Sequence, residues 1–356
     1  MRIRRDTSAS FGVACAVCTL VAGSARAQDE AGPAAPPPVE RTPEPPPGAL
    51  ELGGHHFIIP ASFPTSFVAT YLGIRLGSQL YSAPGLPTSV GTFTPSTLAA
   101  TTAIDLGIKA TDWAGIFARA RFAEVLGSNV SGLVYSGAAF EANAEGGLLF
   151  RLLRVDKSGT QVSLRLSGEY SSGLSISIIP LLTQQVAPTV KTVLQGQLSE
   201  LVRTPLSEWD AQGNIGVAQA LGRCFSLQGY VGGGVSGAEI QPFDTRSGGR
   251  VSSSLTGAQF NAAAAFEADA SPAKIPIAIL AEYAVMRQAS PLALLPLTSI
   301  NFLQTFSLGV YYSGRPNLQL GLIGAAEVGL PTLSTSAGES ATPHSLLGEF
   351  VLMYIW

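Results

Sequence analysis

The sequence has few charged residues and almost no cysteine. Charged side chains make up 13% of the 356 residues, against about 25% in a typical soluble protein. The three cysteines are Cys15, Cys18 and Cys224. We expect the first two to leave with a signal peptide, so the mature chain cannot form an internal disulfide. A low charge content is typical of membrane proteins, yet no segment beyond residue 30 offers the roughly 18 consecutive apolar residues of a membrane helix.

The sequence also lacks recognisable motifs for catalysis or metal binding. It contains no Gly-x-Ser-x-Gly nucleophile motif and no paired-cysteine motif. We expect its three histidines, His55, His56 and His344, to be solvated loop residues. We therefore expect no enzymatic activity, no metal site and no cofactor.

The first 27 residues have the pattern of a secretory signal peptide. Arg2, Arg4 and Arg5 precede an apolar stretch over 11–22, and small residues at 25 and 27 predict cleavage before Gln28. Removing this segment would take away four arginines and one aspartate and change the formal charge from −3 to −6. A mildly acidic mature chain argues against nucleic acid as a partner.

Proline dominates the next stretch. Eight prolines fall within residues 31–48, which predicts an extended, polyproline-like segment without a core. We interpret residues 28–64 as a Pro-rich periplasmic linker. The linker is either a plain spacer or a ligand for a periplasmic partner, and the sequence does not distinguish these.

From residue 65 onward, apolar and polar residues alternate with a period of two. In 317–328, for example, Leu320 and Leu322 share one face and Gln319 and Glu327 share the other. Twelve segments have this pattern: 67–77, 101–111, 114–125, 139–153, 161–173, 209–221, 224–236, 258–270, 274–287, 301–313, 317–328 and 345–356. Apolar-out and polar-in alternation predicts an all-β fold, a transmembrane antiparallel up-and-down β-barrel of about 12 strands over residues 65–356.

The connections and the tryptophans distinguish a membrane barrel from a soluble β-sandwich. Short and long connections alternate along the chain, as periplasmic turns and outer loops do. Trp113, Trp209 and Trp356 all fall at ends of predicted strands, which favours an aromatic girdle at the two membrane interfaces.

The C-terminus provides a family resemblance. Phe350, Tyr354 and Trp356 alternate with apolar residues up to a terminal aromatic. This ending resembles the assembly signal of Gram-negative outer-membrane β-barrel proteins. The resemblance implies location in the outer membrane, contact with its lipid, and the barrel-assembly machinery as a partner. The usual last residue of that signal is Phe, and this chain has Trp.

Strand parity then predicts which charged side chains line the lumen. The candidates are Arg75, Asp105, Lys109, Arg119, Arg121, Glu141, Glu145, Arg151, Arg165, Glu169, Asp210, Glu267, Asp269, Glu282, Glu327 and Glu349. All the basic residues lie on the first five strands, and the acids from Asp210 onward lie on the remaining strands. Because unpaired charge in a dry interior is costly, the lumen must contain either water or ion pairs.

Two functions remain open at this point. The first is a passive channel or uptake protein for small solutes. The second is a structural or adhesive barrel with a sealed lumen, which binds a partner through its outer loops or Pro-rich tail. A barrel of eight strands is filled by its own side chains, whereas one of sixteen strands leaves a channel. A count of twelve strands therefore does not decide between the two functions. Within the long loop over 174–208, the segment 188–203 has helical spacing and is either an inward plug or a surface cap.

Overall fold

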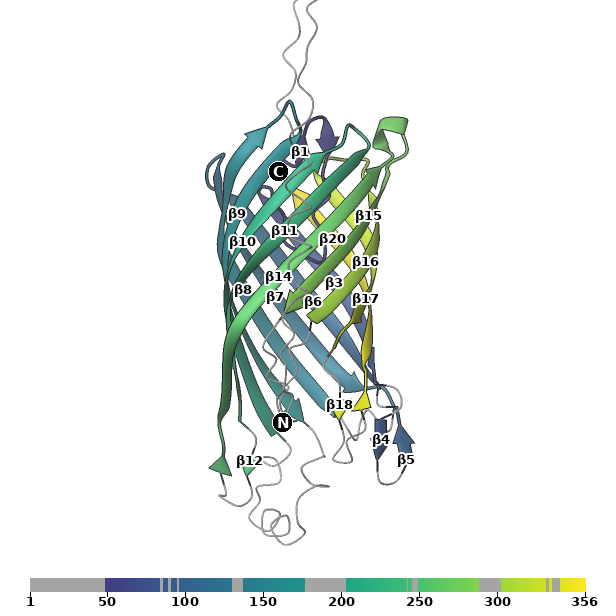
Figure 1. The fold of residues 1–356 in the computed structure, drawn as a ribbon. Helices are drawn as coiled ribbons and strands as arrows, with labels where there is room; N and C mark the ends of the chain where they lie inside the picture. The colour runs from purple at the N-terminus through teal and green to yellow at the C-terminus, as the bar shows by residue number, and fades with distance from the viewer. Residues whose placement is uncertain are drawn as a thin grey trace, which may run out of the picture. The chain divides into compact units, whose positions relative to one another are not determined.

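The computed structural model describes residues 49–83, 86–88, 91–94, 96–129, 137–176, 203–241, 243–244, 249–287, 302–330, 333–334 and 340–356. Most of them build one β-barrel (Figure 1). Its wall consists of β3 (Tyr71–Ser82), β6 (Ser96–Lys109), β7 (Ala114–Gly127), β8 (Ala138–Val155), β9 (Thr160–Ile176), β10 (Arg203–Ala220), β11 (Phe225–Ile240), β14 (Ser253–Asp269), β15 (Ile277–Arg287), β16 (Phe302–Tyr312), β17 (Leu318–Val328) and β20 (His344–Ile355). In the described part of the chain, no helix has the length and apolar character needed to span a membrane.

The barrel is closed by pairing between its first and last wall strands. Each wall strand pairs antiparallel with the wall strands before and after it, and β20 pairs with β3. In this seam Leu352 lies opposite Ile74. Closure leaves no open sheet edge with unpaired backbone groups, a condition for any sheet surrounded by lipid. The prediction of a twelve-stranded antiparallel barrel is confirmed.

The apolar residues of the wall face outward. On β17 the side chain of Leu322 is 65% exposed, whereas Gln319 and Ile323 on the other face are 4% and 5% exposed. The same alternation holds on β3, where Leu72, Ile74 and Leu76 are exposed and Arg75 is buried. An apolar surface that surrounds the barrel would drive aggregation in water and is stable when lipid covers it.

The two ends of the barrel differ, and we call them the turn end and the loop end. At the turn end, strands are joined by the short connections 110–113, 156–159, 221–224, 270–276 and 313–317. Two of these contain glycines with positive φ, Gly159 (+65°) and Gly222 (+88°), where an L side chain would be strained. The connection 270–276 includes the 3-10 turn η1 (Ser271–Ala273). Short turns are typical of the periplasmic end of such barrels.

The loop end carries three small hairpins beyond the wall. They are β4 (Leu86–Thr88) with β5 (Gly91–Phe93), β12 (Phe243–Asp244) with β13 (Gly249–Arg250), and β18 (Leu333–Ser334) with β19 (Ser340–Ala341). The helix expected at 188–203 lies, apart from Arg203, outside the described residues.

Two of the three tryptophans lie at an end of the barrel, and the third lies elsewhere than expected. Trp113 and Trp356 are exposed at the turn end, where Trp113 stacks on Phe150 with ring centroids 6.1 Å apart. Trp209, by contrast, lies inside β10 and opposite Tyr170 rather than at a strand end. The strand is longer than predicted, because it begins at Arg203. From Trp209 to Ala220 it is still long enough to cross a bilayer, which takes about 9–11 residues.

Candidate functional site in the barrel lumen

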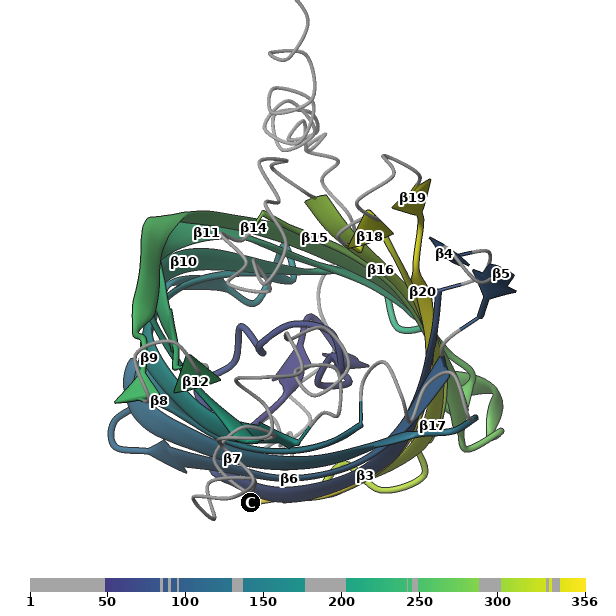
Figure 2. The same cartoon turned by 90° about the horizontal axis from the view of Figure 1, so that it is seen from below.

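A segment of the chain that precedes the barrel occupies the lumen. Residues 49–70, which we call the plug, lie inside the ring of wall strands, and Figure 2 shows their first part in purple. The plug begins with a hairpin at the turn end, β1 (Glu51–Leu52) and β2 (His55–His56). Residues 49–64 had been expected to belong to the linker. In the structure they are packed against the wall, while residues 28–48 lie outside the described residues.

Apolar side chains anchor the plug to the wall. Phe57 and Phe67 are 0% and 1% exposed, with ring centroids 4.9 Å apart, and they join a buried cluster with Met353 of β20. Phe63 stacks on Tyr230 of β11 with centroids 6.1 Å apart. Each fully buried side chain of this kind contributes about 1.5–3 kcal/mol. These apolar contacts with the wall therefore stabilise the plug inside the barrel.

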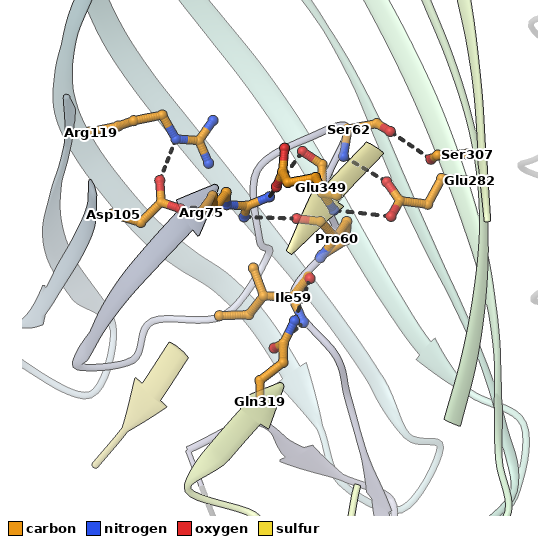
Figure 3. Close-up of polar contacts among 11 residues, drawn as sticks. Ile59, Pro60, Ser62, Arg75, Asp105, Arg119, Glu282, Ser307, Gln319 and Glu349 are labelled. Carbon is orange, nitrogen blue, oxygen red and sulfur yellow. Dashed lines mark hydrogen bonds and ion pairs between the residues drawn. The ribbon is translucent and has the colours of Figure 1, made fainter. Parts of the chain in front are cut away.

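Wall side chains pair with the backbone of the plug. Glu282 of β15 accepts hydrogen bonds from the backbone N–H groups of Ala61 (3.0 Å) and Ser62 (2.7 Å). Gln319 of β17 pairs with both backbone groups of Ile59, each at 3.0 Å (Figure 3). The plug between residues 57 and 70 has no ladder of its own, so its buried N–H and C=O groups require such partners. This requirement explains why acids and amides, rather than apolar residues, line this part of the wall.

Arg75 connects the plug to an ion-pair network of the wall. Its guanidinium pairs with Asp105 at 2.6 Å and with Glu349 at 3.3 Å, and it donates to the backbone carbonyls of Pro60 and Ala61 at 3.4 Å. Asp105 also accepts from Arg119 of β7 (Figure 3). Arg75 and Asp105 are 6% and 3% exposed, so each charge is paired within the protein rather than solvated.

At the turn end, a buried histidine of the plug faces a carboxylate of the wall. His55 is fully buried, with Nδ1 3.1 Å from the carbonyl of Arg223 and Nε2 3.4 Å from Oε1 of Glu267. Because a carbonyl only accepts, Nδ1 donates to it, and Nε2 then faces the carboxylate favourably when it too carries a proton. Burial opposes that charge, but the hydrogen bond and the negative charge of Glu267 outweigh burial and raise the pKa of His55. The expectation that His55 is solvated is wrong.

The second oxygen of Glu267 strengthens the same connection. Oε2 accepts from the backbone N–H of Ile58 at 3.1 Å and from the hydroxyl of Ser226 at 3.0 Å. Other ionisable groups around His55 are Asp269 of β14, Glu51 of β1 and the neighbouring His56. One wall carboxylate therefore holds the plug at two points.

The plug fills the lumen at the turn end. Every one of the twelve wall strands contributes at least one inward residue that is less than 9% exposed in this half of the barrel. A cavity of about 10 Å³ beside Arg75, Asp105 and Phe117 has room for about one water molecule. In the loop half, inward side chains such as Glu141, Arg121 and Glu169 retain exposure. The described residues thus form a lumen closed at the turn end, with a vestibule toward the loop end.

All the charged residues listed above as lumen candidates lie on the inward face of their strands, but in different surroundings. Those that contact the plug or its ion-pair network are Arg75, Asp105, Arg119, Glu267, Glu282 and Glu349. Those around the vestibule are Arg121, Glu141, Glu145, Glu169, Asp210 and Glu327. Arg165 lies between the two groups, because it is 6% exposed and lines the small cavity beside the plug while it pairs with Glu145. Lys109, Arg151 and Asp269 lie toward the turn end, where Lys109 pairs with Asp112 at 2.6 Å.

Sequence reasoning missed the plug and several of its partners. Gln161 and Gln228 donate to the backbone carbonyls of Ser66 (2.6 Å) and Ile58 (2.8 Å). A signal was present, because Phe57-Ile58-Ile59 is too apolar for a solvated linker. Glu208 was missed because the predicted strand began at 209. Arg154 was missed because the predicted strand ended at 153, and because a bulge between Arg151 and Leu153 turns Arg154 inward, where it donates to the carbonyl of Glu51.

The closed sheet and its apolar exterior together define the class. The protein is an outer-membrane β-barrel. Phe350, Tyr354 and Trp356 all lie on the outer face of β20, the strand that closes the barrel.

Comparisons with known proteins add similarities of fold. No protein-family model and no curated protein sequence matches the chain. The translocator domain of the autotransporter NalP from Neisseria meningitidis is 9% identical, with a TM-score of 0.47, and the match covers 81% of this chain and 88% of that one. A FadL homologue from Pseudomonas aeruginosa is 9% identical with a TM-score of 0.47, covering 86% and 95%. An outer membrane channel from Pseudomonas putida F1 is 10% identical with a TM-score of 0.45, covering 84% and 100%. Such values are too low to transfer a function.

Proposed function

We propose that the protein is an outer-membrane channel for small polar solutes and that the plug is its gate. The observation that carries the proposal is how the plug is held. Among the described residues, no backbone–backbone hydrogen bond joins residues 49–69 to a wall strand. The plug can therefore leave the lumen while the barrel ladder, including the β20–β3 seam, stays intact.

The size of the barrel supports the same proposal. An eight-stranded barrel fills with its own side chains, whereas wider barrels leave space inside. In this twelve-stranded barrel the inward positions that pack against the plug include the small residues Ala265 of β14 and Ala278 of β15. A wall built to seal itself would carry larger side chains there. The proposed role is passive, and no catalytic step forms part of it.

The second candidate is a permanently sealed structural barrel. The buried network of Arg75, Asp105 and Glu349 favours it, because breaking buried ion pairs costs several kcal/mol. The two candidates differ in whether the plug ever leaves the lumen.

A reversible disulfide between plug and wall tests the gate. The hydroxyls of Ser62 and Ser307 are 2.8 Å apart, close enough for Cβ atoms to meet disulfide geometry. The variant Ser62→Cys/Ser307→Cys would be made with Cys224→Ser, which removes the remaining cysteine of the expected mature chain. We expect single-channel openings in planar bilayers that stop on oxidation and return on reduction.

A matched control places a second pair of cysteines away from the plug. The hydroxyls of Ser96 and Ser128 are 2.7 Å apart near the loop end, so Ser96→Cys/Ser128→Cys adds a disulfide within the wall. Its openings should not depend on redox state. Openings that persist in the oxidised plug variant would show that the plug is not the gate. A folded protein without openings in any state would favour the sealed structural barrel.

A further inference from the structure

Carboxylates gather on one wall of the vestibule. Glu145 of β8, Glu169 of β9 and Asp210 of β10 are direct cross-strand neighbours on the inward face. Glu141 and Glu208 lie on the same inward faces toward the loop end. Like charges directly opposite one another destabilise a sheet. Three adjacent carboxylates across three strands therefore need compensation by positive charge.

The arginines of the lumen do not supply enough of it. Arg165 pairs with Glu145 at 2.5 Å, and Arg119, the direct cross-strand neighbour of Glu145, forms its ion pair with Asp105 on the opposite strand. Glu169 receives a hydrogen bond from Asn143, and Asp210 receives one from Gln212 at 3.1 Å. Both of these donors are neutral amides.

Arg121 of β7 is the remaining cation on this side of the vestibule. Its cross-strand neighbours are Ala103 and Asn143 rather than an acid. In the described part of the chain, no ion pair to Glu169 or Asp210 is formed. Even with Arg119, Arg121 and Arg165 all counted, the five carboxylates outnumber the cations and leave an excess of negative charge.

Buried oxygen atoms without partners lie in the same row. Ser236 of β11 is the direct cross-strand neighbour of Asp210, faces inward and is 4% exposed. Its Oγ and the Oδ1 of Asp210 are both buried, and neither has a hydrogen-bond partner among the described residues. Asn214, two inward positions from Asp210 toward the turn end, is 1% exposed, and neither its amide oxygen nor its amide nitrogen has a partner among the described residues. A buried acceptor left unpaired costs about 1–3 kcal/mol, so the oxygens of Asp210 and Ser236 favour a ligand that brings hydrogen-bond donors.

We propose that this row is a binding site for linear organic oligoamines. Ammonium groups supply both the positive charge and the N–H donors that the row lacks. Neighbouring strands lie about 4.8 Å apart, so the three carboxylates form a line rather than a cage. The described residues contain no group of three such side chains arranged to hold a metal ion. A line of charges fits a flexible chain that carries several ammonium groups better than a single ion. That such an amine is the solute of the channel rests on the function proposed above, whereas the binding itself does not.

Calorimetric titration of spermidine into the full mature protein in detergent at low salt tests the site. The wild type should bind spermidine, and Glu169→Gln/Asp210→Asn should bind at least tenfold more weakly. Glu327→Gln is the matched control, because it removes a carboxylate from β17, where Glu327 accepts from Gln79 at 2.9 Å. Its affinity should equal that of the wild type. Replacing both acids by amides preserves side-chain size, and folding is checked by the heat-modified mobility of the barrel.

The possible results separate the proposals. Equal affinity in the double variant, or an equal loss in Glu327→Gln, would overturn the oligoamine site. Competition by magnesium chloride at matched ionic strength as effective as that of a diamine would also overturn it, because a metal would then be the better ligand. Binding of spermidine by a protein that never conducts would leave the site standing and refute the channel.

Discussion

The backbone contacts of Glu282 allow one perturbation of the plug to be worked out in detail. Its two carboxylate oxygens accept from two consecutive plug N–H groups, at 3.0 and 2.7 Å. Glu282→Gln keeps one acceptor and places an NH2 group against the other N–H. A hydrogen bond to a charged group contributes about 1.5–3 kcal/mol, and about 1.4 kcal/mol corresponds to a tenfold change in an equilibrium. The population with the plug released should therefore rise about 10- to 100-fold.

Hydrogen exchange measured by mass spectrometry reads that population directly. Peptides that cover residues 57–67 should exchange about 10- to 100-fold faster in Glu282→Gln, because exchange follows the local opening equilibrium. Peptides from β17 and β20 should keep their protection. Glu327→Gln serves as the control, since Glu327 bonds Gln79 instead of the plug. Unchanged exchange in 57–67, or equal acceleration throughout the wall, would refute the view that Glu282 holds a separately opening plug.

Two further predictions concern the turn end. The raised pKa of His55 means that its protonated form stabilises the plugged state. This stabilisation is complete below about pH 6.5, the unperturbed histidine pKa, and is lost as the pH rises through the raised value. The open probability in bilayers should therefore increase from pH 6 to pH 9. The variant His55→Gln should remove that dependence. An unchanged pH profile in the variant would contradict the role of His55. Gly53 has a φ of +61°, and a Cβ there would lie 2.9 Å from Cα of Gly159. Gly53→Ala should destabilise the β1–β2 hairpin by about 1–2 kcal/mol, measured as faster exchange over 50–57, and Ala49→Gly at the edge of the same cluster should have a smaller effect.

The barrel wall could be predicted because its pattern is local. Lipid on one side and the lumen on the other impose a period of two, and the leucines at 320 and 322 together with Gln319 and Glu327 show it without reference to any distant part of the chain. Strand ends were less certain. The sequence predicted that Trp209 begins a strand, whereas the pairing of β10 with β9 continues to Arg203.

Which lumen residues act together was beyond the sequence. Parity placed Glu267 and Glu282 inward, but it could not show that they bind backbone N–H groups more than 200 residues earlier in the chain. The plug has no strand or helix periodicity between Phe57 and Thr70, because its backbone is satisfied by side chains instead of a ladder. The sequence by itself therefore determined the closed membrane barrel and the sides of its strands. Tertiary structure alone decided that the lumen is occupied, because the partners of an irregular segment are set by where the closed wall places its side chains.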